Sequence, residues 1–163
     1  MIKIFITGGT FDKSYDHING NLFFKKTHLP EMIKRSKCLL DIEIETILMK
    51  DSLDLTIEDV SRIVESCKNE KSNRIIITHG TDTITNTAKL ISNQKLLNKT
   101  IILTGAMIPY AFGSSSDGFF NLGCALSFVQ TLNPGVYITM QGEYFKWNEV
   151  EKNNEIGVFE RKK

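Results

Sequence analysis

Apolar, β-branched runs alternate with helical patterns along most of the chain, and this alternation restricts the fold more than any other feature. Runs of this length and composition are typical of buried strands. The five runs comprise residues 2–6, 42–48, 74–78, 100–103 and 136–140. Strands that alternate with helices form βαβ units with right-handed crossovers. The sequence therefore predicts an α/β fold, a doubly wound and mostly parallel sheet of about five strands with helices on both faces.

Three helices are predicted between these strands. The clearest begins after Thr56, which is followed three positions later by Asp59 in the pattern of a capping box, and its apolar residues lie on one face. A second helix is expected to start near Asp82. A third is expected to start at Asp117 and to end before Pro134.

The composition limits the size and the partners of this fold. With 163 residues the chain fits one domain. It carries 20 Lys and Arg against 19 Asp and Glu, so neither nucleic acid nor a membrane surface is expected as a partner. The three cysteines lack a CxxC spacing, and no metal site or disulfide is predicted. The first apolar run is too short for a signal peptide or a membrane span, which makes a cytoplasmic location the default expectation.

Two segments outside the predicted helices and strands stand out. Residues 11–29 are rich in Asp, Asn, Gly, Lys and His. They form a long connection for a compact domain, which is typical of a functional loop or lid. The tail from Glu149 is polar and ends in basic residues, so it is predicted to leave the sheet.

Two threonines beside glycines give the strongest functional signal. Thr10 follows Gly8 and Gly9 at the end of the first run, and Thr81 follows Gly80 after the third. Because ligands bind at the carboxyl ends of the strands in open parallel sheets, both hydroxyls are expected at one ligand-binding edge. The exposed N–H groups of the glycine pair suit a phosphate or an oxyanion. A tight turn with a capping threonine is the structural alternative, and no dinucleotide or phosphate-loop fingerprint is present.

A threonine hydroxyl needs a base before it can act as a nucleophile. Tyr15 follows Thr10 by five positions and is the first candidate, with His17 as the runner-up. Asp82 beside Thr81 suits the ammonium group of an amino acid, although an aspartate at a helix start is also ordinary.

Two further segments are predicted to reach the same edge. Ser52 follows the second run, where its hydroxyl and backbone suit a carboxylate, although a plain turn is equally expected there. The small residues around Ala106 follow the fourth run and allow a ligand to approach the backbone closely. His79 is interpreted as a hydrogen-bonded residue near the core rather than a metal ligand.

Taken together, these segments resemble the motifs of the bacterial-type L-asparaginases. In chain order the matching segments are residues 7–10, 51–52, 79–83, 104–107 and 116–118. The resemblance covers nearly the whole chain but only the N-terminal domain of that family, a flavodoxin-like three-layer sandwich. It is closest to the short single-domain members. It therefore implies one domain over residues 1–163, without the C-terminal domain of the long members.

The resemblance implies hydrolysis of L-asparagine to L-aspartate and ammonia, with no metal and no organic cofactor. Thr10 would attack the side-chain amide carbon, Tyr15 would assist its deprotonation, and water would release aspartate from an acyl-enzyme. Thr81, Asp82 and Lys152 would form a second catalytic cluster. Lys146, which lies nearby in the sequence, is the alternative to Lys152.

The family's substrate contacts imply that Ser52 and Asp82 hold the α-carboxylate and the α-amino group. Gly9 and the backbone of Ala106 would lie near the amide. Leu53 stands where long members often have a polar substrate contact. A homo-oligomer, a dimer or a tetramer, would supply groups that replace the second domain.

Three alternatives remain beside this interpretation. The protein could hydrolyse glutamine or another small ω-amide, because one methylene changes discrimination by only about 1–3 kcal/mol. It could be a non-catalytic module that binds asparagine or aspartate, although retention of both threonines argues against a relic. A flavodoxin-like nucleotide binder is the least supported, since the glycine fingerprint is missing.

Overall fold

The computed structural model describes residues 1–162, and at its centre lies a six-stranded sheet of order β4-β1-β5-β6-β7-β8. Five of its strands are parallel, namely β1 (Ile2–Gly8), β4 (Ile42–Lys50), β5 (Arg74–Thr78), β6 (Thr100–Thr104) and β7 (Gly135–Met140). The sixth, β8 (Glu143–Lys146), pairs antiparallel with β7. The predicted α/β class and all five predicted strands are confirmed, and β8 adds an antiparallel edge that the sequence interpretation did not include.

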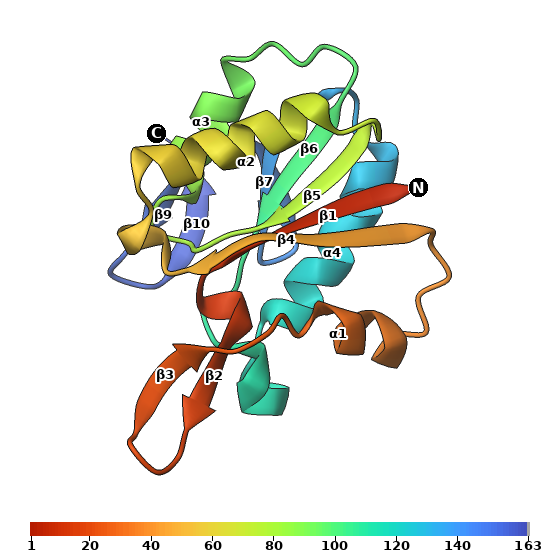
Figure 1. Cartoon of the computed structure of the whole chain (residues 1–163). Coiled ribbons are helices and arrows are strands. Elements are labelled where there is room, and N and C mark those ends of the chain that lie inside the picture. The colour runs from red at the N-terminus through yellow and green to blue at the C-terminus, as the bar shows by residue number, and fades with distance from the viewer. Residues whose placement is uncertain (163) are drawn as a thin grey trace.

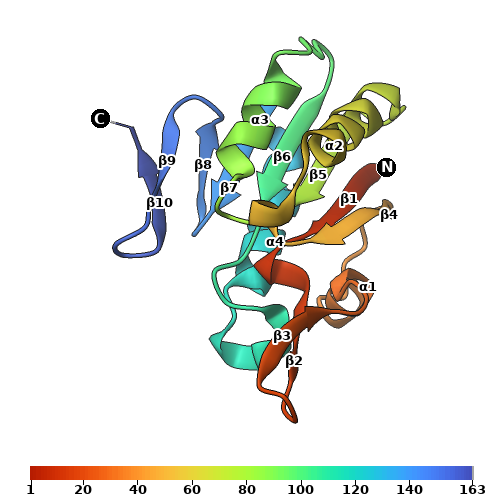
Figure 2. The same cartoon turned by 60° about the vertical axis from the view of Figure 1, so that its left-hand side comes forward.

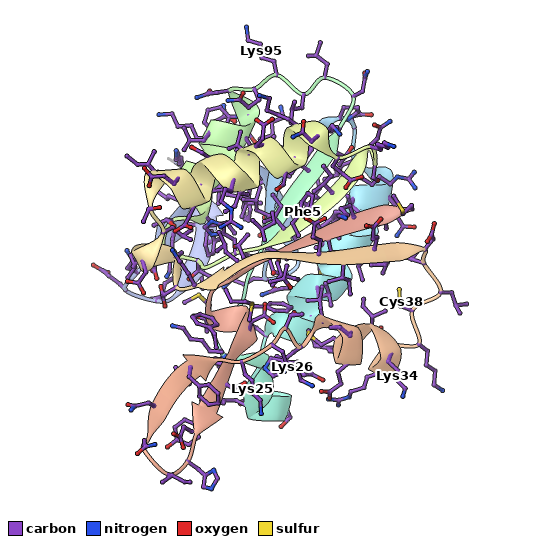
Figure 3. All side chains as sticks on the ribbon, viewed as in Figure 1. Phe5, Lys25, Lys26, Lys34, Cys38 and Lys95 are labelled. Atoms are coloured by element: carbon purple, nitrogen blue, oxygen red, sulfur yellow. The ribbon has the colours of Figure 1, made fainter. Side chains whose placement is uncertain are left out.

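Helices cover both faces of the sheet (Figure 1). On one side lie α2 (Ile57–Asn69) and α3 (Ile84–Ser92), and on the other lie α1 (Leu29–Arg35) and α4 (Gly118–Thr131). Alternation along β1 places Phe5 in the core under α2, which Figure 3 shows, and Ile4 and Ile6 in the core under α1 and α4. The central strands β1, β5 and β6 are therefore buried on both faces, as the apolar runs predicted, whereas the edge strands β4 and β8 are partly exposed.

The start of α2 has the predicted capping box. The Asp59 amide donates to the Thr56 hydroxyl at 3.2 Å, and the Thr56 amide donates to the Asp59 carboxylate at 3.1 Å. Lys50 at the end of β4 also pairs with Asp59, at 2.6 Å. This ion pair joins the start of the helix to the neighbouring strand.

Two hairpins lie outside the main sheet, and the sequence interpretation assigned neither. Within the long connection, β2 (Lys13–Asp16) and β3 (Asn21–Phe24) pair around a turn that contains Gly20 at φ 72°. The predicted loop is therefore a hairpin, which projects away from the central sheet in Figure 1.

The second hairpin consists of β9 (Val150–Asn153) and β10 (Val158–Arg161), and it lies beside β8 and α3 (Figure 2). The prediction that the tail leaves the sheet is correct only in part. The hairpin does not join the six strands, but Val150 and Phe159 are buried in the same core as α2 and α3. Two apolar side chains of a polar segment thus anchor the hairpin in the core.

The strand order defines where a ligand is expected. From β1 the chain crosses to β4 on one side, and from β4 it returns to β5 on the other side of β1. The switch point therefore lies between β1 and β5, and ligands of doubly wound folds bind outside the carboxyl ends of the strands at this place. Among residues 1–162, no helix has the length and apolar character that crossing a bilayer requires.

Candidate active site

Glycines bring the turns after four strands into direct contact at the switch point. A methyl group on Gly9, whose φ is 70°, would lie 2.4 Å from the Gly80 amide nitrogen. One on Gly80 would lie 2.5 Å from the Ser52 side chain, and one on Gly105 would lie 2.5 Å from the His79 carbonyl oxygen. Only glycine permits these approaches. The segments selected from the sequence therefore form one compact unit.

The first threonine turn is open. Thr10 begins the 3₁₀ helix η1 (Thr10–Asp12) and is half-buried, while the Gly9 amide before it donates to the Lys50 carbonyl at 2.8 Å. Tyr15 lies on β2, 51% exposed, with its ring edge-on to Phe112 at 5.9 Å. None of the hydrogen bonds within residues 1–162 joins the Thr10 hydroxyl to the Tyr15 phenol. The structure thus places the two residues on the consecutive elements η1 and β2 without a hydrogen bond between their hydroxyl groups.

The second threonine turn is closed by a lysine. Lys152 on β9 donates to the Thr81 hydroxyl at 2.9 Å and pairs with Asp82 Oδ1 at 2.6 Å. Thr81 is buried and the Lys152 side chain is only 14% exposed. Lys146, the alternative from the sequence, is 63% exposed and pairs with Glu149 at 3.7 Å. Of the two lysines, the structure brings Lys152 to the cluster.

The charges of this cluster have clear chemical consequences. An ammonium group that donates to a hydroxyl oxygen favours loss of the hydroxyl proton, because it stabilises the resulting alkoxide. Lys152 also neutralises Asp82 through one carboxylate oxygen, Oδ1. The second oxygen, Oδ2, has no hydrogen bond within residues 1–162 and can accept one from a ligand.

Ser52 carries an unsatisfied polar atom beside this cluster. It begins the 3₁₀ helix η2 (Ser52–Asp54), is 3% exposed, and its hydroxyl oxygen is buried without a hydrogen-bond partner among residues 1–162. Its carbonyl accepts from the Thr83 hydroxyl at 3.1 Å. A buried hydroxyl without a partner costs about 1–3 kcal/mol, which a ligand oxygen would offset.

Asp51 and Lys13 join the turn after β4 to the first hairpin. Their side chains form an ion pair, and both are mostly buried. Burial opposes the charged form of Asp51, but the Lys13 ammonium and the Leu53 amide outweigh it and hold the pKa of the carboxyl below its ordinary value. The base of the β2–β3 hairpin is therefore tied to the turn that carries Ser52.

His79 is a buried structural residue, in agreement with its interpretation from the sequence. Its Nδ1 lies 2.8 Å from the Gly80 carbonyl oxygen and its Nε2 lies 2.9 Å from the Thr87 hydroxyl. Burial lowers the pKa of the imidazole to about 4, so the ring is neutral near pH 7. Because a carbonyl only accepts, we assign the proton to Nδ1, and His79 then fixes the glycine that contacts the first turn.

Two polar residues that were not assigned to the site, one at the N-cap of α4 and one within α4, hold the turn after β6. Asp117, which the sequence analysis gave as a helix start and as part of the matching motif at residues 116–118, accepts from the Met107 amide at 3.0 Å and the Ile108 amide at 2.9 Å. Asn121 is fully buried and donates to the Gly105 carbonyl at 3.0 Å. An asparagine on an apolar helix face was the available signal. Ala106, between these contacts, is buried as well.

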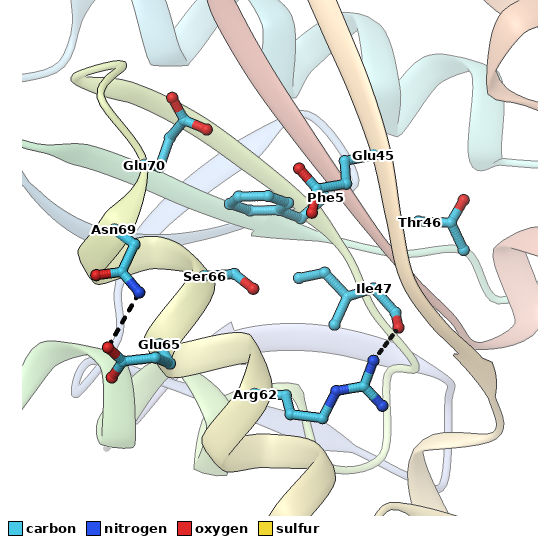
Figure 4. A pocket seen from close by; sticks show the side chains of 9 residues that line it. All are labelled: Phe5, Glu45, Thr46, Ile47, Arg62, Glu65, Ser66, Asn69 and Glu70. Carbon is cyan, nitrogen blue, oxygen red and sulfur yellow. Dashed lines mark hydrogen bonds between the residues drawn. The ribbon is translucent and has the colours of Figure 1, made fainter.

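The site does not coincide with the cleft shown in Figure 4. That cleft, of about 480 Å³, lies between β4 and α2, and Arg62 reaches across it to donate to the Ile47 carbonyl at 2.9 Å. None of the candidate site residues lines it. Among residues 1–162, no three His, Cys, Asp or Glu side chains are grouped to hold a metal ion.

The sheet order and the two threonine turns at its switch point place this protein in the class of flavodoxin-like α/β proteins with a hydroxyl-bearing site. The chain belongs to the asparaginase family, because residues 1–159 match the family model described as "Asparaginase, N-terminal".

Relatives of known name agree with this assignment. L-asparaginase 1 of Escherichia coli K12 is 35% identical over 133 residues, which cover 77% of this chain and 39% of that relative. Glutaminase-asparaginase of Acinetobacter glutaminasificans is 31% identical over 120 residues, which cover 72% of this chain and 35% of that relative. The chain thus spans well under half the length of these relatives.

A solved structure shows the same fold. The thermostable L-asparaginase from Thermococcus kodakarensis superposes with a TM-score of 0.83 and 26% identity, over 98% of this chain and 50% of that one.

Proposed function

We propose that this protein is an amidohydrolase that converts L-asparagine to L-aspartate and ammonia through a threonine nucleophile and an acyl-enzyme. The observation that carries the proposal is the contact of Lys152 with Thr81 and Asp82, at 2.9 Å and 2.6 Å, at the switch point of an asparaginase-family fold. A lysine about seventy positions away in the sequence meets both residues of the turn. This arrangement favours proton transfer from a hydroxyl.

In the proposed first half-reaction, the Thr10 oxygen attacks the side-chain amide carbon while Tyr15 assists removal of its proton. The backbone N–H of Thr10 stabilises the oxyanion of the tetrahedral intermediate, because the Gly9 amide already donates to the Lys50 carbonyl. The C–N bond then breaks, the nitrogen takes up a proton and leaves as ammonia, and an ester to Thr10 remains. In the second half-reaction, water oriented by Thr81 and Lys152 cleaves this ester and regenerates the hydroxyl.

The proposed substrate contacts use groups that have unused hydrogen-bonding capacity. The unpartnered Ser52 hydroxyl suits the α-carboxylate. The free Oδ2 of Asp82 suits the α-ammonium, which would share this carboxylate with Lys152. The close approach of Gly9 to Gly80 leaves the backbone rather than side chains to face the amide, beside Ala106.

The test is ammonia release from the purified protein given L-asparagine. Thr10→Val removes the hydroxyl and keeps the shape, so turnover should disappear while the circular dichroism spectrum stays the same. Thr131→Val, at an exposed position at the end of α4, is the matched control and should leave turnover unchanged. Full activity in Thr10→Val would rule out this nucleophile.

A second candidate substrate class is glutamine or another small ω-amide. Leu53 is 71% exposed at the place where the family resemblance implies a polar substrate contact, so one constraint on substrate length is missing. The Acinetobacter relative is named for both amides. The ratio of kcat/KM for the two amides, measured on the same preparation, decides between them.

A binding module for asparagine or aspartate is the candidate from another class. The open Thr10 turn favours it, since no hydrogen bond among residues 1–162 joins Thr10 to Tyr15, whose ring packs against Phe112 instead. Calorimetric binding of L-aspartate without any release of ammonia from L-asparagine would support this alternative.

We also propose that the protein is a homo-oligomer, a dimer or a tetramer, in which a neighbouring copy contributes polar groups to the site. The support is that Thr10 is half-buried and Tyr15 is 51% exposed, which leaves room for groups from a neighbouring copy at the first turn. Sedimentation equilibrium together with turnover measured against protein concentration tests this point, because dilution below the dissociation constant should then reduce the specific activity.

A further inference from the structure

Lys152 reaches the site from a hairpin that has no ladder to the main sheet. Strands β9 and β10 form a separate two-stranded sheet, which is anchored by the buried side chains of Val150 and Phe159. Within residues 1–162, three hydrogen bonds join this hairpin to the rest of the protein, and two of them are those of Lys152 itself. The third hydrogen bond must therefore contribute much to the precise placement of the Lys152 ammonium group.

This third hydrogen bond comes from the residue that faces Lys152. Phe159 lies directly opposite Lys152 in the antiparallel pair, and its amide points outward and donates to Gln141 Oε1 at 2.8 Å. Opposed residues of neighbouring strands move together, because their backbones are only about 4.5–5.5 Å apart. Gln141 thus holds the strand pair at the level of the lysine.

Gln141 is in turn fixed to the turn after β6. It has a φ of 58°, which is uncommon for a residue other than glycine, and its amide donates to Asn121 Oδ1 at 2.9 Å. The same Asn121 side chain donates to the Gly105 carbonyl at 3.0 Å. A methyl group on Gly105 would lie 3.3 Å from the Thr81 side chain. Asn121, which is buried, therefore links Gln141 to the backbone beside Thr81.

We propose that Gln141 is a positioning residue that places the Lys152 ammonium against Thr81 and Asp82. Its effect on turnover rests on the proposed function, whereas its effect on the lysine does not. The side chain of Gln141 acts through the Phe159 amide and has no hydrogen bond to Thr81, Asp82 or Lys152 among residues 1–162. Displacement of a catalytic group by about 1 Å can cost about 100-fold in rate, so a single distant hydrogen bond can matter.

Two variants remove the bond without straining the backbone. Gln141→Asn shortens the side chain by one methylene, and Gln141→Gly removes it, while both residues tolerate a positive φ. We expect both to fold, which circular dichroism and thermal melts check. In each, kcat on L-asparagine should fall about tenfold or more.

A second readout does not depend on catalysis. Lys152 is 14% exposed and should react slowly with acetic anhydride, while Lys146, 63% exposed, serves as the internal reference in the same mass spectrum. In both variants the ratio of Lys152 to Lys146 acetylation should rise several-fold. A wild-type protein without turnover would count against the proposed function only, since the acetylation ratio would still decide the role of Gln141.

Gln141→Glu is the matched control, because its carboxylate can still accept from the Phe159 amide at the same reach. It should keep Lys152 protected and retain most of the turnover. The proposal is overturned if Gln141→Asn and Gln141→Gly leave both the acetylation ratio and kcat at wild-type values, or if Gln141→Glu loses both as completely as they do.

Discussion

The two threonine turns lie side by side at one edge of the sheet, yet they differ in how much of their surroundings is already arranged. Thr81 is buried and in contact with Lys152, and His79 holds the glycine before it. Thr10 is half-buried, and its proposed partner Tyr15 lies 51% exposed on a projecting hairpin. The comparison teaches that burial and hydrogen bonds within the chain arrange the second turn, whereas the first depends on an exposed side chain of a projecting hairpin.

The largest loss of activity is expected when Lys152 is removed from the Thr81 turn. Lys152→Met removes the ammonium group and leaves Asp82 and the Thr81 hydroxyl without their partner. We expect kcat on L-asparagine to fall by about 10³-fold, within the range for a proton-transfer or electrostatic group. Lys146→Met, at a 63% exposed position, should have little effect. Equal losses in the two variants would contradict the role of Lys152.

The closed turn should also depend on pH through His79. The pKa of this residue is about 4 in the folded protein, below its ordinary value of 6.5, because burial disfavours the imidazolium. Between pH 4 and pH 6.5, unfolding of the protein is therefore accompanied by the uptake of a proton at His79. The contribution of the neutral His79 to the free energy of unfolding is complete above pH 6.5. It is lost as the pH falls to 4, by roughly 3 kcal/mol in total.

Urea unfolding from pH 4 to 7 measures this dependence. In His79→Gln the remaining carboxylates still titrate, so the difference in slope between the two proteins isolates the imidazole. Parallel pH profiles would show that His79 does not destabilise the protein at low pH.

The variant Tyr15→Phe tests the role of the phenol at the open Thr10 turn. This change removes only the phenol oxygen and keeps the ring that packs against Phe112. If Tyr15 assists deprotonation of Thr10, kcat should fall by about 100-fold without a change in the melting temperature. Activity at the wild-type level would leave Thr10 to be activated by some group other than this phenol.

The smallest effect is expected at the base of the hairpin. Lys13→Met breaks the ion pair with Asp51 and should lower the free energy of unfolding by about 1 kcal/mol. It should also speed amide exchange in residues 13–24, while Lys25→Met, at the exposed position directly after this segment, should not. Unchanged exchange in Lys13→Met would show that the hairpin is held by its other contacts.

Local patterns predicted the central part of this molecule because they coincide with burial. The runs of Ile, Val and Leu became the five parallel strands, and the capping box of Thr56 and Asp59 fixed the start of α2. Once the strands were placed, their order put Thr10 and Thr81 at one edge. The hairpin of residues 13–24 was missed, although Asn19 and Gly20 are a turn signal between its strands.

The remaining part of the site has no local signal. Val150 and Phe159 are isolated apolar residues in a polar segment, and nothing near them in the sequence indicates a second hairpin packed on the core. The choice of Lys152 over Lys146 came from the family resemblance, since a contact over 71 positions leaves no periodic pattern. The hydrogen bonds of Asp117 and Asn121 to the turn after β6 can be recognised only in the folded structure.

The late position of β9 in the chain has a consequence for synthesis on the ribosome. A nascent polypeptide that has emerged as far as β8 already contains all six strands of the sheet, and domains can fold while their synthesis continues. At that stage it holds Thr10, Ser52, Thr81 and Asp82 but not the lysine. The protein can therefore acquire its architecture first and its complete constellation of polar groups only some residues later.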